Sequence, residues 1–130
     1  MRREQQINKF RSDGKTVSPE RLVVLLYERL AGDLADAHAA IIDGDSERRH
    51  AMLLHAQEII EELAYAVRPD VWEGGDGLIA LYDYLLALLV KANIKSDTAA
   101  IAEAARTVDG LAGAWREAYV ELATVSASAS

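Results

Sequence analysis

Residues 80–93 read ALYDYLLALLVKAN, and this stretch decides the fold. Leucine and valine go almost all the way round the helix that its periodicity predicts, and Asp83 is its one charged residue before Lys91. A helix with a single apolar stripe lies on a protein surface, whereas a helix that is apolar on every side must be enclosed by other helices or by a partner. The rest of the sequence must supply that enclosure.

The length and composition of the chain fit one domain with a core of its own. It has 130 residues and no cysteine, which excludes a disulfide framework and a thiolate nucleophile. The N-terminus has no apolar segment after its basic residues, so we expect no signal peptide. The apolar run from Leu78 to Val90 is shorter than a bilayer-spanning helix requires. A cytoplasmic (cytosolic) protein is the expectation.

Charge is unevenly distributed along the chain. The net charge of −7 disfavours nucleic acid as a partner, because such binding relies on Lys and Arg neutralising phosphates. Residues 1–21 nevertheless hold six basic and three acidic residues, which leaves eight basic and eighteen acidic residues for the remainder. A basic arm thus precedes an acidic body. This asymmetry is either ordinary solubility or a sign that the arm lies against the body.

The first two helices are marked by their ends. Ser18-Pro19-Glu20 supplies an N-cap hydroxyl, a proline at the first helical position and an acid in the first turn. Apolar residues then recur at helical spacing as far as Asp43-Gly44, where glycine suits a left-handed cap. We predict that a second helix begins at Asp45 or Ser46 and stops before Pro69.

A break at residues 68–77 separates these helices from the apolar third helix, which we expect to end near Asn93. Ser96-Asp97 caps a fourth helix. No alternation typical of β-strands appears. We predict an all-α fold, an antiparallel four-helix bundle at residues 18–124, with a flexible or short-helical N-terminal arm at 1–17 and a disordered tail at 125–130.

Few residues suggest chemistry. A di-metal site in a helical bundle needs Glu-x-x-His on two helices, and this chain has one match, Glu47 to His50, at a helix start. His38, His50 and His55 fall on different faces or helices. We therefore expect no metal, no cofactor and no enzyme activity, with a metal-binding or enzymatic helical bundle as the alternative. Asp83 either pairs with a basic residue of a neighbouring helix or contacts a partner.

The surplus of apolar surface is the informative feature. The third helix offers more apolar faces than its neighbours in a small bundle easily cover, so a groove that takes a partner's amphipathic helix is one interpretation. A helix central to its own core is the other. A purely structural, self-associating bundle would need a self-complementary apolar face.

The order of motifs favours the groove. The chain carries Ser18-Pro19 followed by Leu22, Leu26 and Tyr27-Glu28, then Ala56 with Ile59-Ile60 and Leu63, then Leu81-Tyr82-Asp83-Tyr84-Leu85 with Lys91-Ala92-Asn93, then Ala114-Trp115-Arg116. In this order and spacing the motifs resemble the FliS family of flagellar secretion (export) chaperones, over residues 7 to about 120.

The resemblance implies a cytoplasmic, non-enzymatic bundle that binds the disordered C-terminal segment of flagellin. Such a chaperone prevents premature polymerisation and supports delivery to an export gate component of the flagellar type III secretion system. It would use no cofactor and no nucleic acid, would not insert into a membrane, and is a possible homodimer when free. Where many members have paired arginines after the Tyr82–Tyr84 motif, this chain has Ala87-Leu88, which predicts either a more apolar groove or tighter core packing.

The resemblance also suggests contact residues. Ile7-Asn8-Lys9-Phe10 looks like the N-terminal apolar and aromatic element of the family, with Phe10 in place of the usual tyrosine. We expect residues 7–17 to cover part of the binding surface until the client displaces them. Tyr27, Tyr82, Tyr84 and Trp115 are side chains of the type that dominates binding energy. The predicted partner-binding residues are Ile7 and Phe10 in the arm, and Leu26, Tyr27, Leu30, Tyr82, Leu85, Leu86 and Leu89 in the groove.

Overall fold

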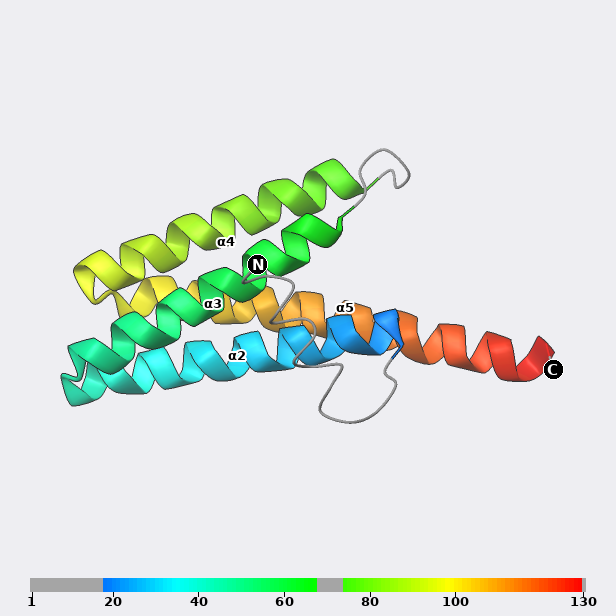
Figure 1. Ribbon diagram of the computed structural model, residues 1–130, viewed down its shortest axis with the longest axis horizontal. Coiled ribbons are helices and arrows are strands. Elements are labelled where there is room, and N and C mark those ends of the chain that lie inside the picture. Colours follow the sequence, from blue (N-terminus) through cyan, green and yellow to red (C-terminus); the bar gives the residue numbers. More distant parts are fainter. Residues whose placement is uncertain (1–17, 68–73, 130) are drawn as a thin grey trace.

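The computed structural model describes residues 18–67 and 74–129, with side chains as far as Glu117 in the last helix. These residues form four helices: α2 (Pro19–Asp43), α3 (Ser46–Ala66), α4 (Gly75–Lys95) and α5 (Thr98–Ala129). The predicted all-α bundle is thereby confirmed. Helix α2 packs against α3 and α5, and α4 packs against the same two helices, so α2 and α4 lie diagonally across the bundle. Figure 1 shows α5 running well past the other helices toward the C-terminus.

Capping residues set the helix starts as predicted. The Ser18 side chain accepts a hydrogen bond from the Arg21 amide at 3.1 Å, with Pro19 at the first helical position. The Asp45 side chain does the same for the Arg48 amide at 3.1 Å. At the start of α5, the Asp97 carboxylate accepts from the Ala99 and Ala100 amides at 3.0 and 3.2 Å. These side chains satisfy amide groups that have no partner within the helix.

Two helix ends use the left-handed backbone conformation. Gly44 closes α2 with φ of 73°, which glycine adopts without the steric cost of a Cβ atom. Ser96 closes α4 with φ of 49°, as a non-glycine residue. Helix α4 begins at Gly75, earlier than the break at residues 68–77 suggested, and Asp76 in its first turn favours that start.

The core is made of inward-facing apolar residues from all four helices. From α2 it takes Leu26, Tyr27, Leu30 and Leu34, and from α4 it takes Tyr82, Leu85 and Leu89. Small alanine side chains complete the packing between the helices. Ala37, Ala56, Ala92 and Ala104 are completely buried. Leu88 also faces the core, whereas Ala87 is exposed to solvent. The Ala87-Leu88 pair therefore contributes one residue to the core and one to the outer face of α4.

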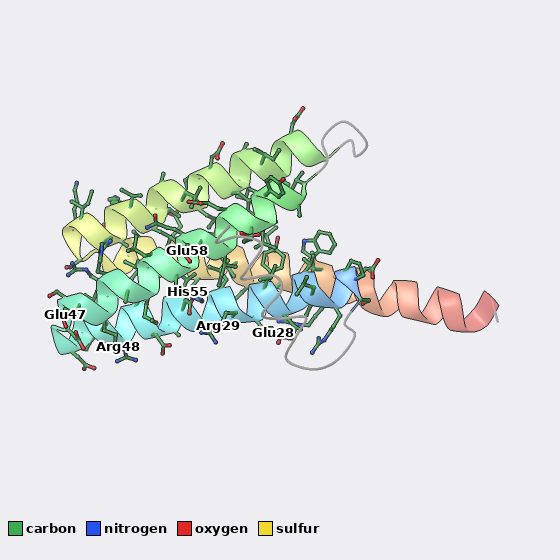
Figure 2. The ribbon with its side chains drawn as sticks, viewed as in Figure 1. Glu28, Arg29, Glu47, Arg48, His55 and Glu58 are labelled. Carbon is green, nitrogen blue, oxygen red and sulfur yellow. The ribbon has the colours of Figure 1, made fainter. Side chains whose placement is uncertain are left out.

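Two acidic side chains are buried in this core, Asp33 and Glu62. Asp33 on α2 hydrogen-bonds to His55 Nδ1 on α3, and the Nε of Arg29 lies 3.7 Å from its other oxygen. Figure 2 labels Arg29 and His55, which come from these two neighbouring helices. Burial raises the pKa of Asp33 and outweighs the opposite effects of His55 and Arg29. The pair therefore fixes α2 against α3 at a cost in desolvation.

A polar clasp joins the start of α3 to the end of α4. We use this name for Arg49, His50, Asn93 and Ser96. Arg49 Nε donates to Asn93 Oδ1 and Arg49 Nη1 donates to Ser96 Oγ, both at 3.1 Å. The Asn93 amide nitrogen donates to His50 Nδ1 at 2.8 Å. The Lys91-Ala92-Asn93 motif thus holds α3 and α4 together. Ala92 packs in the core, and Asn93 hydrogen-bonds to α3 near the surface.

We expect Asn93→Ala to lower the free energy of unfolding by about 1 kcal/mol, since both hydrogen bonds of the Asn93 side chain are lost at a partly buried position. Urea denaturation followed by circular dichroism measures the change. Arg106→Ala, at an exposed position of α5, is the control and should shift it by less than about 0.5 kcal/mol. If the two substitutions lowered the free energy of unfolding equally, the clasp would contribute nothing to stability.

Candidate functional site

An apolar pocket of about 230 Å³ lies at one end of the bundle. It forms where α2 begins, α3 ends and α4 begins, beside the middle of the longer α5. Its walls come from all four helices and from the residue that follows α3. The lining residues are Val23, Leu63, Ala66, Val67, Leu78, Tyr82 and Trp115.

The pocket is the size of a large side chain. An apolar cavity of about 150 Å³ already holds a benzene ring, whereas sites for drug-sized molecules start at about 300 Å³. Almost all of the exposed lining is apolar. An apolar wall with so few polar groups offers no means of orienting a polar substrate, so the pocket suits an aromatic or aliphatic side chain from a peptide.

A hydrogen-bonded aromatic cluster adjoins the pocket, because Tyr82 belongs both to the cluster and to the pocket lining. The hydroxyl oxygens of Tyr27 on α2 and Tyr82 on α4 lie 2.5 Å apart, which joins the diagonal helices through the core. Burial raises the pKa of Tyr27 despite its hydrogen bonds to Tyr82 and Trp115, which act in the opposite direction. Burial, together with Tyr27, also raises the pKa of Tyr82. Both phenols therefore stay protonated across the physiological range.

A second, more polar depression of about 330 Å³ lies between α2 and α5. Alanines on both helices, such as Ala31, Ala35 and Ala105, leave it open, and His38 and Asp109 stand at its edges. It is more exposed than the apolar pocket. A helix of a partner fits such a small-residue surface through backbone proximity rather than through an anchoring side chain.

Large apolar side chains also remain on the surface. Leu54 and Tyr65 are exposed on α3, and Ile42 is exposed at the end of α2. Helix α4 exposes Tyr84, Val90 and Ile94, so part of its apolar circumference is uncovered by the other helices. The three residues on α4 recur at the spacing of one helix face, and contiguous apolar surface is typical of interaction surfaces.

The structure separates the predicted groove residues into different environments. Leu26, Tyr27, Leu30, Leu85 and Leu89 are buried in the core. Tyr82 is also buried, at 2% exposure, but it lines the apolar pocket, and Leu86 is half-buried at the edge of the core. Ile7 and Phe10 lie outside the described residues. That these nine residues contact a partner stays a prediction.

Sequence reasoning did not predict most of the pocket lining. Trp115 was recognised as a side chain suited to binding, but Val23, Leu63, Ala66, Val67 and Leu78 were not. They stand near the ends of α2, α3 and α4, and the predicted break at residues 68–77 was the available signal that these ends meet.

The residues considered for metal chemistry do not converge. Glu47 and His50 are both exposed, and His50 takes part in the polar clasp. Within residues 18–67 and 74–129, no group of three or more His, Cys, Asp or Glu residues is placed to hold a metal ion. Asp83 is exposed, and no basic residue of the described chain forms an ion pair with it.

Helix α4 is long and apolar enough to cross a membrane, by length and composition alone. It has 21 residues, more than the apolar run from Leu78 to Val90. Core helices of soluble proteins have the same properties, and α4 contributes Tyr82, Leu85 and Leu89 to the core. Only 28% of its apolar window is buried, however, so the bundle covers α4 incompletely.

An all-helical bundle with an apolar pocket and uncovered apolar surface is an architecture typical of modules that bind peptides or proteins. The family model for the flagellar protein FliS matches residues 2–122. The chain belongs to the FliS family.

Several relatives carry the name flagellar secretion chaperone FliS. The protein of Bacillus subtilis (strain 168) is 36% identical over 103 residues, which cover 79% of this chain and 77% of the relative. That of Campylobacter jejuni is 32% identical over 105 residues, covering 78% and 80%. That of Escherichia coli (strain K12) is 28% identical over 110 residues, covering 81% and 79%.

Proposed function

We propose that this protein is a cytoplasmic chaperone that binds the disordered C-terminal segment of flagellin, keeps it from polymerising and delivers it to the flagellar export gate. The observation that carries the proposal is the apolar pocket lined by Val23, Leu63, Leu78 and Trp115 at one end of the bundle. Membership of a family whose relatives are named secretion chaperones supports it.

The proposed mechanism is stoichiometric capping without turnover. A disordered amphipathic segment that folds on a partner buries about 1,000–3,000 Å² and loses a few kcal/mol to ordering, which gives a broad but releasable grip. One large side chain of the client enters the pocket as an anchor, and the flanking helical segments lie on the apolar surfaces of the bundle. The N-terminal arm, residues 7–17, covers part of this surface until the client displaces it.

Filling the pocket tests its role in client binding. Ala66 is exposed at the end of α3 and lines the pocket, so Ala66→Trp places an indole there without removing a core side chain. We expect affinity for a flagellin C-terminal peptide to fall at least about tenfold, because the anchor of the client is excluded. Isothermal titration calorimetry gives the affinity.

The matched control is Ala51→Trp, an exposed alanine near the other end of the same helix, which should leave the affinity within about twofold. Two results would contradict the proposal in different ways. If the wild-type chain showed no affinity for the peptide and no rise in melting temperature at high excess, flagellin would not be the client. If Ala66→Trp bound as tightly as wild type, flagellin would bind elsewhere on the bundle.

A further inference from the structure

The aromatic cluster beside the pocket consists of Tyr27, Tyr82 and Trp115. Tyr82 and Trp115 line the pocket, and Tyr27 is completely buried in the core. Tyr27 links the other two, because it hydrogen-bonds to Trp115 and its phenol oxygen lies 2.5 Å from that of Tyr82. Among residues 18–67 and 74–117, these three side chains form no other hydrogen bond.

The aromatic cluster contains one more hydrogen-bond donor than it can use. The indole N–H of Trp115 only donates, so the oxygen of Tyr27 accepts from it. Each tyrosine hydroxyl carries one hydrogen, and the single bond between the tyrosines uses one of these two hydrogens. The other hydroxyl hydrogen is therefore left without an acceptor in the part of the chain that the structure describes.

The surroundings of the two phenols decide which hydrogen is left over. On Tyr27, which has no exposed surface, an unused hydrogen would carry the full cost of desolvation. Tyr82 lies at the pocket wall, where a guest molecule can supply an acceptor. The favoured arrangement is therefore a relay in which Trp115 donates to Tyr27, Tyr27 donates to Tyr82, and the hydroxyl hydrogen of Tyr82 serves the pocket.

This single donor restricts the chemistry of a guest. The rest of the lining is made of apolar side chains, so a guest hydroxyl or amide N–H would stay unpaired there, and a carboxylate would lose its hydration. A carbonyl oxygen avoids both costs, because it accepts a hydrogen bond and brings no hydrogen of its own. One donor does not accommodate a polar substrate, but it gives an apolar guest a defined orientation.

We propose that Tyr82 is the specificity-determining donor of the pocket, and that its hydroxyl group binds a carbonyl oxygen adjacent to the apolar group that enters. In the flagellin client this oxygen belongs to the main chain at the end of a helical segment, since the last four carbonyl groups of a helix have no partner within it. The statement about flagellin rests on the proposed function. The donor at the pocket wall does not depend on it.

Two small probes of similar shape test the donor with the full-length protein. Acetophenone carries a carbonyl oxygen where isopropylbenzene carries a methyl group, and NMR titration gives both dissociation constants. The affinity for acetophenone relative to isopropylbenzene should be about fivefold lower in Tyr82→Phe than in wild type, which is the value of one neutral hydrogen bond. Comparing this ratio between proteins cancels the different hydration of the two probes.

Tyr27→Phe is the matched control. It removes the same bond between the tyrosines but leaves the Tyr82 hydroxyl at the pocket wall, so the ratio should stay within about twofold of wild type. Ala66→Trp fills the pocket and should abolish binding of both probes. The carbonyl infrared band of bound acetophenone needs no variant, and in wild type it should lie at lower frequency than in an apolar solvent.

Several results would overturn the assignment of Tyr82. These are an equal ratio in wild type and Tyr82→Phe, an equal fall in Tyr27→Phe, and a carbonyl band at its apolar-solvent position. Probes that fail to bind wild type, or that bind Ala66→Trp equally well, would do the same. For a flagellin C-terminal peptide, Tyr82→Phe should weaken binding about fivefold more than Tyr27→Phe does. If the probes showed the expected ratio while the peptide did not bind, the donor would be confirmed and flagellin rejected as the client.

Discussion

Leu85→Ala is expected to lower the free energy of unfolding by about 3 kcal/mol, whereas Leu86→Ala, the next position along α4, should lower it by about 1 kcal/mol. Leu85 is completely buried among core residues, so truncation leaves a cavity there. Leu86 is half-buried at the edge of the core, where the surroundings and solvent can adjust. Urea denaturation of both variants gives the comparison.

The same two variants test whether predicted groove residues contact the client. If Leu85 acts through the core, the folded fraction of Leu85→Ala should bind flagellin peptide within about threefold of wild type. Leu86→Ala should weaken binding more, since part of its side chain is accessible. A Leu85→Ala variant that kept wild-type stability but lost its client would show instead that Leu85 is a contact residue.

Tyr82→Phe and Tyr27→Phe should each lower the free energy of unfolding by about 2 kcal/mol. Each substitution removes the hydrogen bond between the two tyrosines, and although Tyr27 keeps Trp115 as a partner, loss of a hydrogen bond at a buried hydroxyl costs about 1–3 kcal/mol. The double variant should lose clearly less than the sum of the single variants, because it leaves neither tyrosine hydroxyl unmatched. Chemical denaturation of the four proteins completes this cycle.

The pH dependence of stability gives an independent measure of the same pair. Both tyrosine pKa values are raised in the folded state, so the folded chain holds these protons more tightly than the unfolded chain. Their contribution is present in full below the unfolded pKa of about 10 and is lost as the pH rises above it. The double variant should lose less stability between about pH 9 and pH 11 than wild type. Parallel pH curves, or additive losses in the cycle, would contradict a coupled pair.

Much of the fold follows from local signals in the sequence. Ser18, Gly44, Asp45 and Asp97 act at short range on their own helix ends, and each caps a helix where it was predicted to do so. The start of α4 was predicted too late, because the glycines at positions 74, 75 and 77 suggested a turn. Burial of Gly75 and the acidic Asp76 in the first turn favour a helix that begins at these glycines.

The candidate site was harder to predict because it depends on how helix ends meet. Periodicity identifies Tyr27, Tyr82 and Leu85 as apolar-face residues, but it does not tell a core position from a groove position. The pocket combines Val23, Leu63, Leu78 and Trp115, which are far apart in sequence and share no motif. Their proximity results from the different lengths of the helices, with α5 continuing beyond the point where α2 and α4 begin.

The polar clasp and the apolar pocket lie at opposite ends of the bundle, and this gives the domain an uneven stiffness. At the clasp, hydrogen bonds of defined geometry tie α3 to α4. At the pocket, apolar side chains surround a void and tolerate small displacements. The side chains around the pocket can therefore shift with a smaller loss of interaction than those of the clasp, while the Tyr27–Tyr82 hydrogen bond holds α2 to α4 beside them.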